Sequence, residues 1–212
     1  MIVAIDGPAG AGKSTVARSL AERLGFRYLD TGAMYRALTW LALQRGLDLG
    51  DGAALGELAA ACPIELDEAG RVFIDSTDVT AAIRQARIDR MVPVVARHAE
   101  VRGVMRERQK ELAELGNCVI EGRDIGTVVA PHAEVKVFLV ADPSVRASRR
   151  LAERPEIADA EALATDLRTR DQSDSVRTLP ADDADVIDTT ELEVAEVVDR
   201  IERLVRSRIP AR

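Results

Sequence analysis

The sequence predicts an α/β fold built on a parallel sheet, and three observations carry that prediction. A glycine-rich loop joins a short apolar run at 2–5 to a helical pattern. Short apolar runs then alternate with helical patterns, the clearest buried run being VKVFLV at 135–140. Such alternation is typical of parallel sheets covered by helices on both faces. A β-rich stretch interrupts it near 63–75. We therefore expect a five-stranded parallel sheet flanked by helices, with an inserted β-rich subdomain.

Length and composition fit one globular domain over 1–212, since 47% of the residues are hydrophobic. The net charge of −7 argues against nucleic-acid binding, which needs a basic surface. Cys62 and Cys118 lack CxxC spacing, which favours reduced thiols. The chain begins on an apolar strand, and no apolar run approaches the ~20 residues of a membrane span. We expect a cytoplasmic protein that contacts no membrane.

The first loop, GPAGAGKS at 7–14, fits the pattern of Gly, four residues, Gly, Lys and Ser or Thr that marks a phosphate-binding loop. The pattern requires a strand before it and a helix after it, and both are predicted here. Loop N–H groups and the helix N-terminus attract phosphate oxygens. We expect Lys13 to reach the β- and γ-phosphates and Ser14 to coordinate Mg²⁺. The predicted nucleoside triphosphate site consists of Gly7, Pro8, Ala9, Gly10, Ala11, Gly12, Lys13, Ser14 and Thr15.

The second apolar run, 26–29, ends at Asp30 and Thr31 and leads into a helical pattern that carries Arg36. Open α/β sheets bind ligands at the carboxyl ends of their strands. We therefore expect Thr31 and Arg36 to lie near phosphates. Asp6 also ends a strand, and we expect both strand-end aspartates to accept hydrogen bonds within turns rather than to bind Mg²⁺.

The inserted subdomain is predicted over 63–90, with two short strands joined by a hairpin turn at 68–70. Asp67 to Gly70 also fits the D-x-x-G pattern of GTPases, but the chain has no guanine-reading N-K-x-D motif, so we interpret the match as chance. A charged helical pattern follows from 79 to 115. Pro93 is expected to divide it into two helices.

The third strand, 119–120, leads directly into Arg123 and Asp124. This pair therefore follows a strand at the edge where parallel sheets place their ligands. A last short strand is expected at 186–187, followed by a final helix with one apolar stripe. No helix shows a second apolar stripe, so we expect a monomer.

A helix after Pro143 carries Arg146, Arg149 and Arg150 at spacings that place them on one face. The segment 151–161 that follows is interpreted as a short lid. These arginines either close over the transferring phosphoryl group or form a polar helix face, and the spacing alone leaves both readings open.

In combination, the segments GPAGAGKS, LDTGAMYR, DVTAAIR after the β-rich insert, EGRDIGT and TRDQSDSVR resemble the bacterial cytidylate kinase family over essentially the whole chain. The loop alone fixes only the superfamily of P-loop kinases, whereas EGRDIGT with LDTGAMYR and the insert differs from adenylate, guanylate and shikimate kinases. The resemblance implies a transferase of pyrimidine nucleotide metabolism that moves the γ-phosphoryl group of ATP to CMP or dCMP, with Mg²⁺. Its partners would be small nucleotides alone.

The resemblance also implies site residues. Arg36, Arg123 and Arg177 would hold the acceptor phosphate, Arg170 and Asp174 the ribose, and Arg102 and Asp124 the base, while Lys13, Arg123, Arg146 and Arg150 would serve the transfer itself. A carboxylate can accept from the N4 amino group of cytosine, and a guanidinium can donate to O2 and N3. Two features depart from the family: Pro93 stands where a serine is frequent, and the stretch between Arg150 and Arg170 is short.

Two alternatives stay open at this point. One is a kinase for another small acceptor such as UMP or shikimate. The other is a nucleotide-dependent switch without turnover, although no partner surface is marked in the sequence. His98 and His132 lack the spacing of metal ligands or of a general base, and no G-x-S-x-G motif is present, which argues against hydrolases and metalloenzymes.

Overall fold

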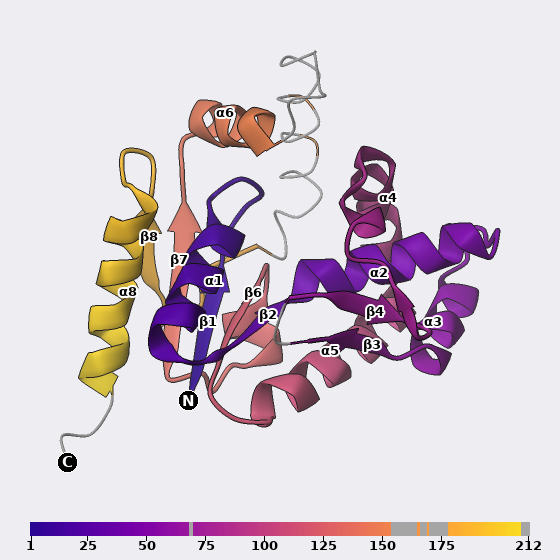
Figure 1. Cartoon of the computed structure of the whole chain (residues 1–212), viewed down its shortest axis with the longest axis horizontal. Coiled ribbons are helices and arrows are strands. Elements are labelled where there is room, and N and C mark those ends of the chain that lie inside the picture. The colour runs from indigo at the N-terminus through magenta and orange to yellow at the C-terminus, as the bar shows by residue number, and fades with distance from the viewer. Residues whose placement is uncertain (68–69, 154–164, 166–168, 170–177, 209–212) are drawn as a thin grey trace. The chain divides into compact units, whose positions relative to one another are not determined.

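The structure is a computed structural model of the chain (Figure 1), and it describes residues 1–67, 70–153, 165, 169 and 178–208. It divides into two compact units, Met1–Arg27 with Gly116–Arg212, and Tyr28–Leu115. Within the described ranges, no helix has the length and apolar character needed to cross a membrane. Cys62 and Cys118 are both buried free thiols, as predicted.

The main sheet confirms the predicted five-stranded parallel sheet, with the strand order β2-β6-β1-β7-β8. Its strands are β1 (Ile2–Asp6), β2 (Arg27–Asp30), β6 (Cys118–Gly122), β7 (Val135–Val140) and β8 (Asp185–Asp188). The boundary between the two units falls inside β2. The central strand β1 is buried throughout and pairs in parallel with β6 and β7, so that Asp6 lies level with Gly122 and Phe138. This register places the end of β1 beside the segment that follows β6.

The helical elements that the structure describes in the first unit accompany this sheet. They are α1 (Lys13–Leu24), the π-helical turn η2 (Ile125–Val129), α6 (Pro143–Glu153) and α8 (Val194–Arg208). Helix α8 contacts α1 and β7 (Figure 1) and buries Val197, Val198, Ile201 and Val205. This confirms the predicted single apolar stripe of the last helix. Most of the predicted lid 151–161 lies outside the described residues.

The second unit combines helices with a three-stranded antiparallel sheet. Its elements are α2 (Thr31–Gln44), α3 (Gly52–Ala61), β3 (Ile64–Leu66), β4 (Val72–Ile74), β5 (Thr77–Asp78), the 3₁₀ turn η1 (Ala82–Arg84), α4 (Ala86–Ala96) and α5 (Ala99–Glu114). The small sheet lies within the predicted insert 63–90, whose bounds stay a prediction. Strand β5 was not predicted, because Asp75 and Ser76 form its two-residue turn with positive φ angles of 51° and 58°, a conformation usually signalled by glycine or asparagine.

The predicted division of the 79–115 helix at Pro93 is wrong. Pro93 lies inside α4, and the chain leaves the helical conformation only at His98, whose ψ is 128°. A proline inside a helix removes one backbone hydrogen bond. Helix α4 tolerates that loss, and Ile88, Val92 and Val95 on its buried face hold it in place.

Candidate active site

The loop between β1 and α1 has the strand-loop-helix context that its motif requires. Gly7 and Gly10 have φ angles of 146° and 76°, where side chains with a Cβ are rarely found. A Cβ on Gly7 would lie 2.2 Å from the carbonyl oxygen of Leu139, and one on Gly10 would lie 2.9 Å from that of Arg146. The loop therefore needs glycine at both positions, for its backbone conformation and for its close packing.

The helix that follows the loop presents groups that suit an anion. Gly12 is the N-cap of α1 and offers no side chain to its first N–H groups, which in such helices attract phosphate oxygens. Ser14 and Thr15 are exposed in the first turn. The ammonium of Lys13 donates to the carbonyl of Pro8 over 2.7 Å. Lys13 thus lies against the loop and places its charge beside the loop backbone.

Two arginines of α6 stabilise the loop between β1 and α1 through hydrogen bonds. Arg146 is only 7% exposed and donates to the carbonyl of Ala9 over 3.1 Å. Arg149 donates to the hydroxyl of Thr189 over 3.0 Å and to its carbonyl over 2.6 Å, and that hydroxyl lies 3.2 Å from the carbonyl of Ala11. The predicted arginine face of α6 therefore contacts the loop, directly through Arg146 and through Thr189 for Arg149. Arg150 is half-buried on the same helix.

A second set of contacts, here called the Asp6 junction, joins the start of the loop to the segment after β6. It consists of Asp6, Gly7, Arg123, Ile125 and Gly126. The carboxylate of Asp6 accepts from the N–H of Ile125 over 2.9 Å and from that of Gly126 over 2.8 Å. Arg123 donates to the carbonyl of Gly7 over 2.7 Å. Asp6 accepts backbone hydrogen bonds as predicted, but its partners lie about 120 positions away in sequence and not in its own turn.

The environment of Asp6 changes its acidity. Asp6 is 5% exposed, and burial raises the pKa of its carboxyl to about 6, against an ordinary value of 3.8. The N–H groups of Gly126 and Ile125 act in the opposite direction, while the charge of Asp124 raises the pKa further and that of Lys13 lowers it. Burial dominates because a carboxylate loses its hydration there.

In the second unit, Asp30, Arg36 and Arg84 form what we call the Asp30 cluster. Asp30 caps α2 by accepting from the N–H of Ala33 over 2.8 Å. Its Oδ2 also accepts from Arg36 over 2.9 Å and from Arg84 over 3.3 Å. Burial alone would raise the pKa of Asp30, but the two guanidiniums and the Ala33 N–H hold it below its ordinary value. One carboxylate thus orients two arginines at the N-terminus of a helix, beside the buried Thr31.

Arg84 was missed by reasoning from sequence. Its segment, DVTAAIR, contributed to the family resemblance, but its arginine received no role. The signal that could have found it is its position at the end of the β-rich insert, in η1. Its side chain is 46% exposed although it reaches Asp30.

The remaining predicted residues are distributed as follows. Arg102 lies half-exposed on α5 of the second unit, and Asp124 lies half-buried just before η2 in the first. Arg170, Asp174 and Arg177 lie outside the described residues. The substrate contacts predicted for these residues, and for the other residues of the predicted site, all stay predictions.

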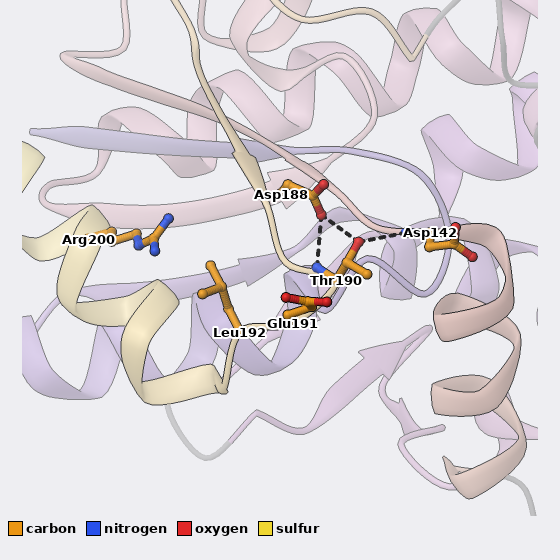
Figure 2. Close-up of a pocket in the computed structure, with 6 residues that line it drawn as sticks. All are labelled: Asp142, Asp188, Thr190, Glu191, Leu192 and Arg200. Atoms are coloured by element: carbon orange, nitrogen blue, oxygen red, sulfur yellow. Dashed lines mark hydrogen bonds between the residues drawn. The ribbon is translucent and has the colours of Figure 1, made fainter.

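A separate pocket of about 510 Å³ lies beside the end of β8 in the first unit (Figure 2). It is lined by Asp142, Asp188, Thr190, Glu191, Leu192 and Arg200. Figure 2 shows that Thr190 bridges two of these residues. Its N–H donates to Asp188 over 2.9 Å, and its hydroxyl accepts from the N–H of Asp142 over 3.0 Å. Among the residues that the structure describes, none of those in the predicted site lines this pocket.

Comparisons of the sequence with known proteins identify its family. A sequence model of the family described as "Cytidylate kinase" matches residues 3–207. The cytidylate kinase of Shouchella clausii (strain KSM-K16) is 50% identical over 214 residues, which cover 96% of this chain and 95% of that protein. That of Bacillus subtilis (strain 168) is 47% identical over 209 residues, which cover 94% and 93%.

Solved structures of lower identity share the fold. A shikimate kinase from Bacteroides thetaiotaomicron has a TM-score of 0.53 at 20% identity and covers 97% of this chain and 98% of its own. A gluconokinase from Sinorhizobium meliloti 1021 has a TM-score of 0.54 at 16% identity, with 97% and 91% covered. At these identities the likeness concerns the fold alone.

Proposed function

Because this chain belongs to the cytidylate kinase family, a transferase family that passes the γ-phosphoryl group of ATP to CMP or dCMP, we propose that its two clusters divide the two substrates. The loop at 7–15 binds ATP, and the Asp30 cluster binds the phosphate of the acceptor. The observation that carries this proposal is that a family match over residues 3–207 coincides with a loop of the phosphate-binding pattern and with a second cluster in which two arginines share one carboxylate. The enzyme is proposed to act as a cytoplasmic monomer on small nucleotides.

On the ATP side, Lys13 is proposed to change its hydrogen-bond partner when the nucleotide binds. Its ammonium is held at 2.7 Å from the carbonyl of Pro8, and it would exchange this neutral partner for the charged β- and γ-phosphates. The attraction between Lys13 and the phosphates is strongest when negative charge moves onto the leaving oxygens. Lys13 therefore acts chiefly by stabilising the transition state. Arg146 keeps the loop in shape meanwhile, through its bond to Ala9. We therefore assign Arg146 to supporting the loop, and Arg150 to the transferring group.

Mg²⁺ fits the same site as a cation that arrives with the nucleotide. Magnesium takes few protein ligands and keeps water and phosphate oxygens around it. Ser14 presents an exposed hydroxyl beside Lys13, and within the part of the chain that the structure describes no group of three His, Cys, Asp or Glu could hold a metal. When bound, Mg²⁺ would neutralise charge on the phosphates, with Ser14 as its protein ligand.

On the acceptor side, the Asp30 cluster carries two guanidiniums for one carboxylate. A planar guanidinium can bind phosphate oxygens through two parallel hydrogen bonds. The N-terminus of α2 adds its partial positive charge. We propose that Arg36, Arg84 and Arg123 hold the acceptor phosphate, together with Arg177, and that Thr31 contributes from the first turn of α2.

The base would be recognised by Asp124 and Arg102. Cytosine offers an N4 amino donor to a carboxylate, and its O2 and N3 accept from a guanidinium. Uracil has an O4 acceptor in place of the N4 amino group and an N3–H donor in place of the N3 acceptor. The Asp124 carboxylate would then face another acceptor, and the Arg102 guanidinium another donor. Sites that hydrogen-bond a substrate group can reject a mispairing analogue by about 10⁴-fold.

A coupled assay of ADP formation tests the proposed function against its alternatives. CMP, dCMP, UMP, AMP, GMP and shikimate are each supplied with ATP and Mg²⁺, and we expect turnover with CMP and dCMP far above the rest. Acceptor-independent, slow hydrolysis of ATP would support a switch instead. Preference for UMP or shikimate would move the enzyme to another acceptor class.

The base-reading residues have their own test in the substitution Asp124→Asn. A side-chain amide can turn its NH₂ group toward O4 of uracil, so kcat/KM for CMP should fall and that for UMP should change little or rise. The ratio of the two should fall by on the order of 10²-fold or more. Arg102→Ala should weaken CMP use and leave the KM for ATP nearly unchanged. A ratio that stays at the parent value in Asp124→Asn would mean that other groups read the base.

A further inference from the structure

We propose that Asp6 is a positioning residue that fixes the acceptor-binding segment Arg123–Gly126 to the start of the ATP-binding loop. The inference rests on the proposed function, because Arg123 and Asp124 receive their acceptor roles there. It adds a residue that touches neither substrate in the proposal but holds in place the segment that presents the acceptor.

The bonds of the Asp6 junction converge on two consecutive residues. Asp6 ends β1 and Gly7 begins the loop, and the first accepts two N–H bonds while the second accepts one bond from Arg123. Along β1 and β6 the parallel register runs to Asp6 and Gly122. Beyond that point, the side chain of Asp6 takes over from the β1 backbone and accepts from the N–H groups of Ile125 and Gly126, in the segment that follows β6. The segment that carries Arg123 and Asp124 is therefore held by bonds at both of its ends.

This arrangement requires a carboxylate in particular. The two oxygens of Asp6 each accept from a different N–H group, at 2.9 and 2.8 Å. An asparagine has only one acceptor oxygen, and its NH₂ group would face one of the two donors. A buried backbone N–H without a partner is costly. Gly126 adds a tight fit, since a Cβ there would lie 3.4 Å from Asp6 and 3.3 Å from Lys136.

Charged residues are found on each element next to Asp6, although Glu121 of β6 pairs with Ile5 and so lies on the opposite face of the sheet. Lys13 at the start of α1 favours its ionised form, and Asp124 before η2 disfavours it. Lys136 of β7 passes Gly126 and binds Asp183 over 2.9 Å, and Glu121 of β6 lies one residue before the level of Asp6. Of these, only Lys13 moves its charge toward ATP in the proposed reaction. The ionised junction and the phosphate-binding lysine are thus electrostatically connected.

Solution NMR of the full-length protein tests the junction without reference to activity. The amide protons of Ile125 and Gly126 are followed from pH 7.5 to 4.5 in the parent, in Asp6→Asn, and in Asp51→Asn as a matched control. Asp51 also accepts a backbone N–H, from Ala54 over 3.0 Å at the N-cap of α3. We expect both amides to shift with a midpoint near pH 6 in the parent and the control, and this transition to be missing in Asp6→Asn. Ile125 and Gly126 amides that exchange with solvent in the parent at pH 7.5 as fast as unbonded, exposed amides would overturn the proposal even if the variant failed to fold.

Kinetics separate positioning from general stability. At pH 7.5, Asp6→Asn should raise the KM for CMP by about 10-fold and leave the KM for ATP within about two-fold, while Asp51→Asn changes neither. The phosphate of CMP also gains a proton near pH 6, so kcat/KM for CMP in acid should fall with two ionisations in the parent and with one in Asp6→Asn. Equal loss for both substrates would overturn the positioning role. A parent without CMP-dependent turnover would refute the acceptor assignment, whereas titrating amides would still support the junction itself.

Discussion

Asp6 and Asp30 occupy equivalent places in the two units and have opposite acid–base behaviour. Each ends a strand of the parallel sheet, each is 5% exposed, and each accepts backbone N–H groups. Yet the pKa of Asp6 is raised to about 6, whereas that of Asp30 is lowered. The difference lies in their partners, which are N–H dipoles for Asp6 and two guanidiniums for Asp30.

The comparison shows what a strand-end carboxylate can organise. Dipoles compensate only part of the lost hydration of a buried anion, whereas full opposite charges exceed it. Asp6 therefore stays ionised at neutral pH at a cost in stability and orders a backbone segment. The ionised form of Asp30 stabilises the fold, and it orders two side chains, Arg36 and Arg84. Stability sacrificed at a fixed position is a frequent sign of function.

The largest effect on activity is expected from a substitution beside Asp6 that leaves the Asp30 cluster intact. Lys13→Ala removes the cation that favours ionised Asp6 and the charge that would meet the transferring phosphoryl group. Single-turnover rates should fall by on the order of 10²-fold or more, the scale for loss of one preorganised donor. Equilibrium affinity for CMP, measured by calorimetry, should stay within a few-fold. Rates near the parent value would contradict the assignment of the loop.

The next effect concerns the Asp30 side. Arg84→Ala should raise the KM for CMP by about 10-fold, since one charge-assisted hydrogen bond contributes roughly 1.5 kcal/mol or more. The KM for ATP should not change. Arg87→Ala is the matched control, because Arg87 is an exposed arginine of the same region whose guanidinium bonds only to Gln85 among the contacts described. Equal responses of the two variants would show that general charge, and not the Asp30 cluster, attracts the acceptor.

Stability as a function of pH separates the two aspartates directly. The folded state holds the Asp6 proton more tightly than the unfolded state, so protonation of Asp6 stabilises the fold. For Asp6, a pKa of about 6 against 3.8 corresponds to about 3 kcal/mol. As the pH falls from 7 to 4, the free energy of unfolding of the parent should therefore gain on that of Asp6→Asn by up to this amount. Urea unfolding at each pH measures the difference.

Asp30→Asn should give the opposite trend. The lowered pKa of Asp30 means that its ionised form stabilises the fold at every pH above the ordinary value of 3.8. This contribution disappears as the pH falls below 3.8 toward the lowered folded value, so the advantage of the parent over Asp30→Asn should shrink between pH 5 and 3. Trends of the same sign for both variants would refute the contrast between dipole and guanidinium partners.

Much of the fold could be read from local sequence, whereas the site could be read only in part. The loop at 7–14 was predictable because four fixed positions and the flanking periodicity lie within about 20 residues. The Asp6 junction and the Asp30 cluster were not, because Asp6 meets Gly126 across 120 positions and Asp30 meets Arg84 across 54. Such pairs depend on the strand order of the sheet and on the path of the insert. The predicted helix boundary at Pro93 was wrong for a related reason, because tertiary packing outweighed the local preference of proline.

The smallest effect is expected at a third strand end. Asp188 closes β8 and accepts from the N–H of Thr190 over 2.9 Å, and this bond and that of the Thr190 hydroxyl lower its pKa. It is exposed, however, so water compensates its charge in both the folded and the unfolded state, and an asparagine oxygen can accept the same N–H. Asp188→Asn should shift the Tm by no more than about 2 °C and leave the pH dependence of unfolding between pH 7 and 4 unchanged. The KM for CMP should stay within about two-fold of the parent. Thermal unfolding of Asp188→Asn beside Asp6→Asn makes the measurement, and a comparable loss in both would mean that the strand-end position, rather than burial, gives Asp6 its properties.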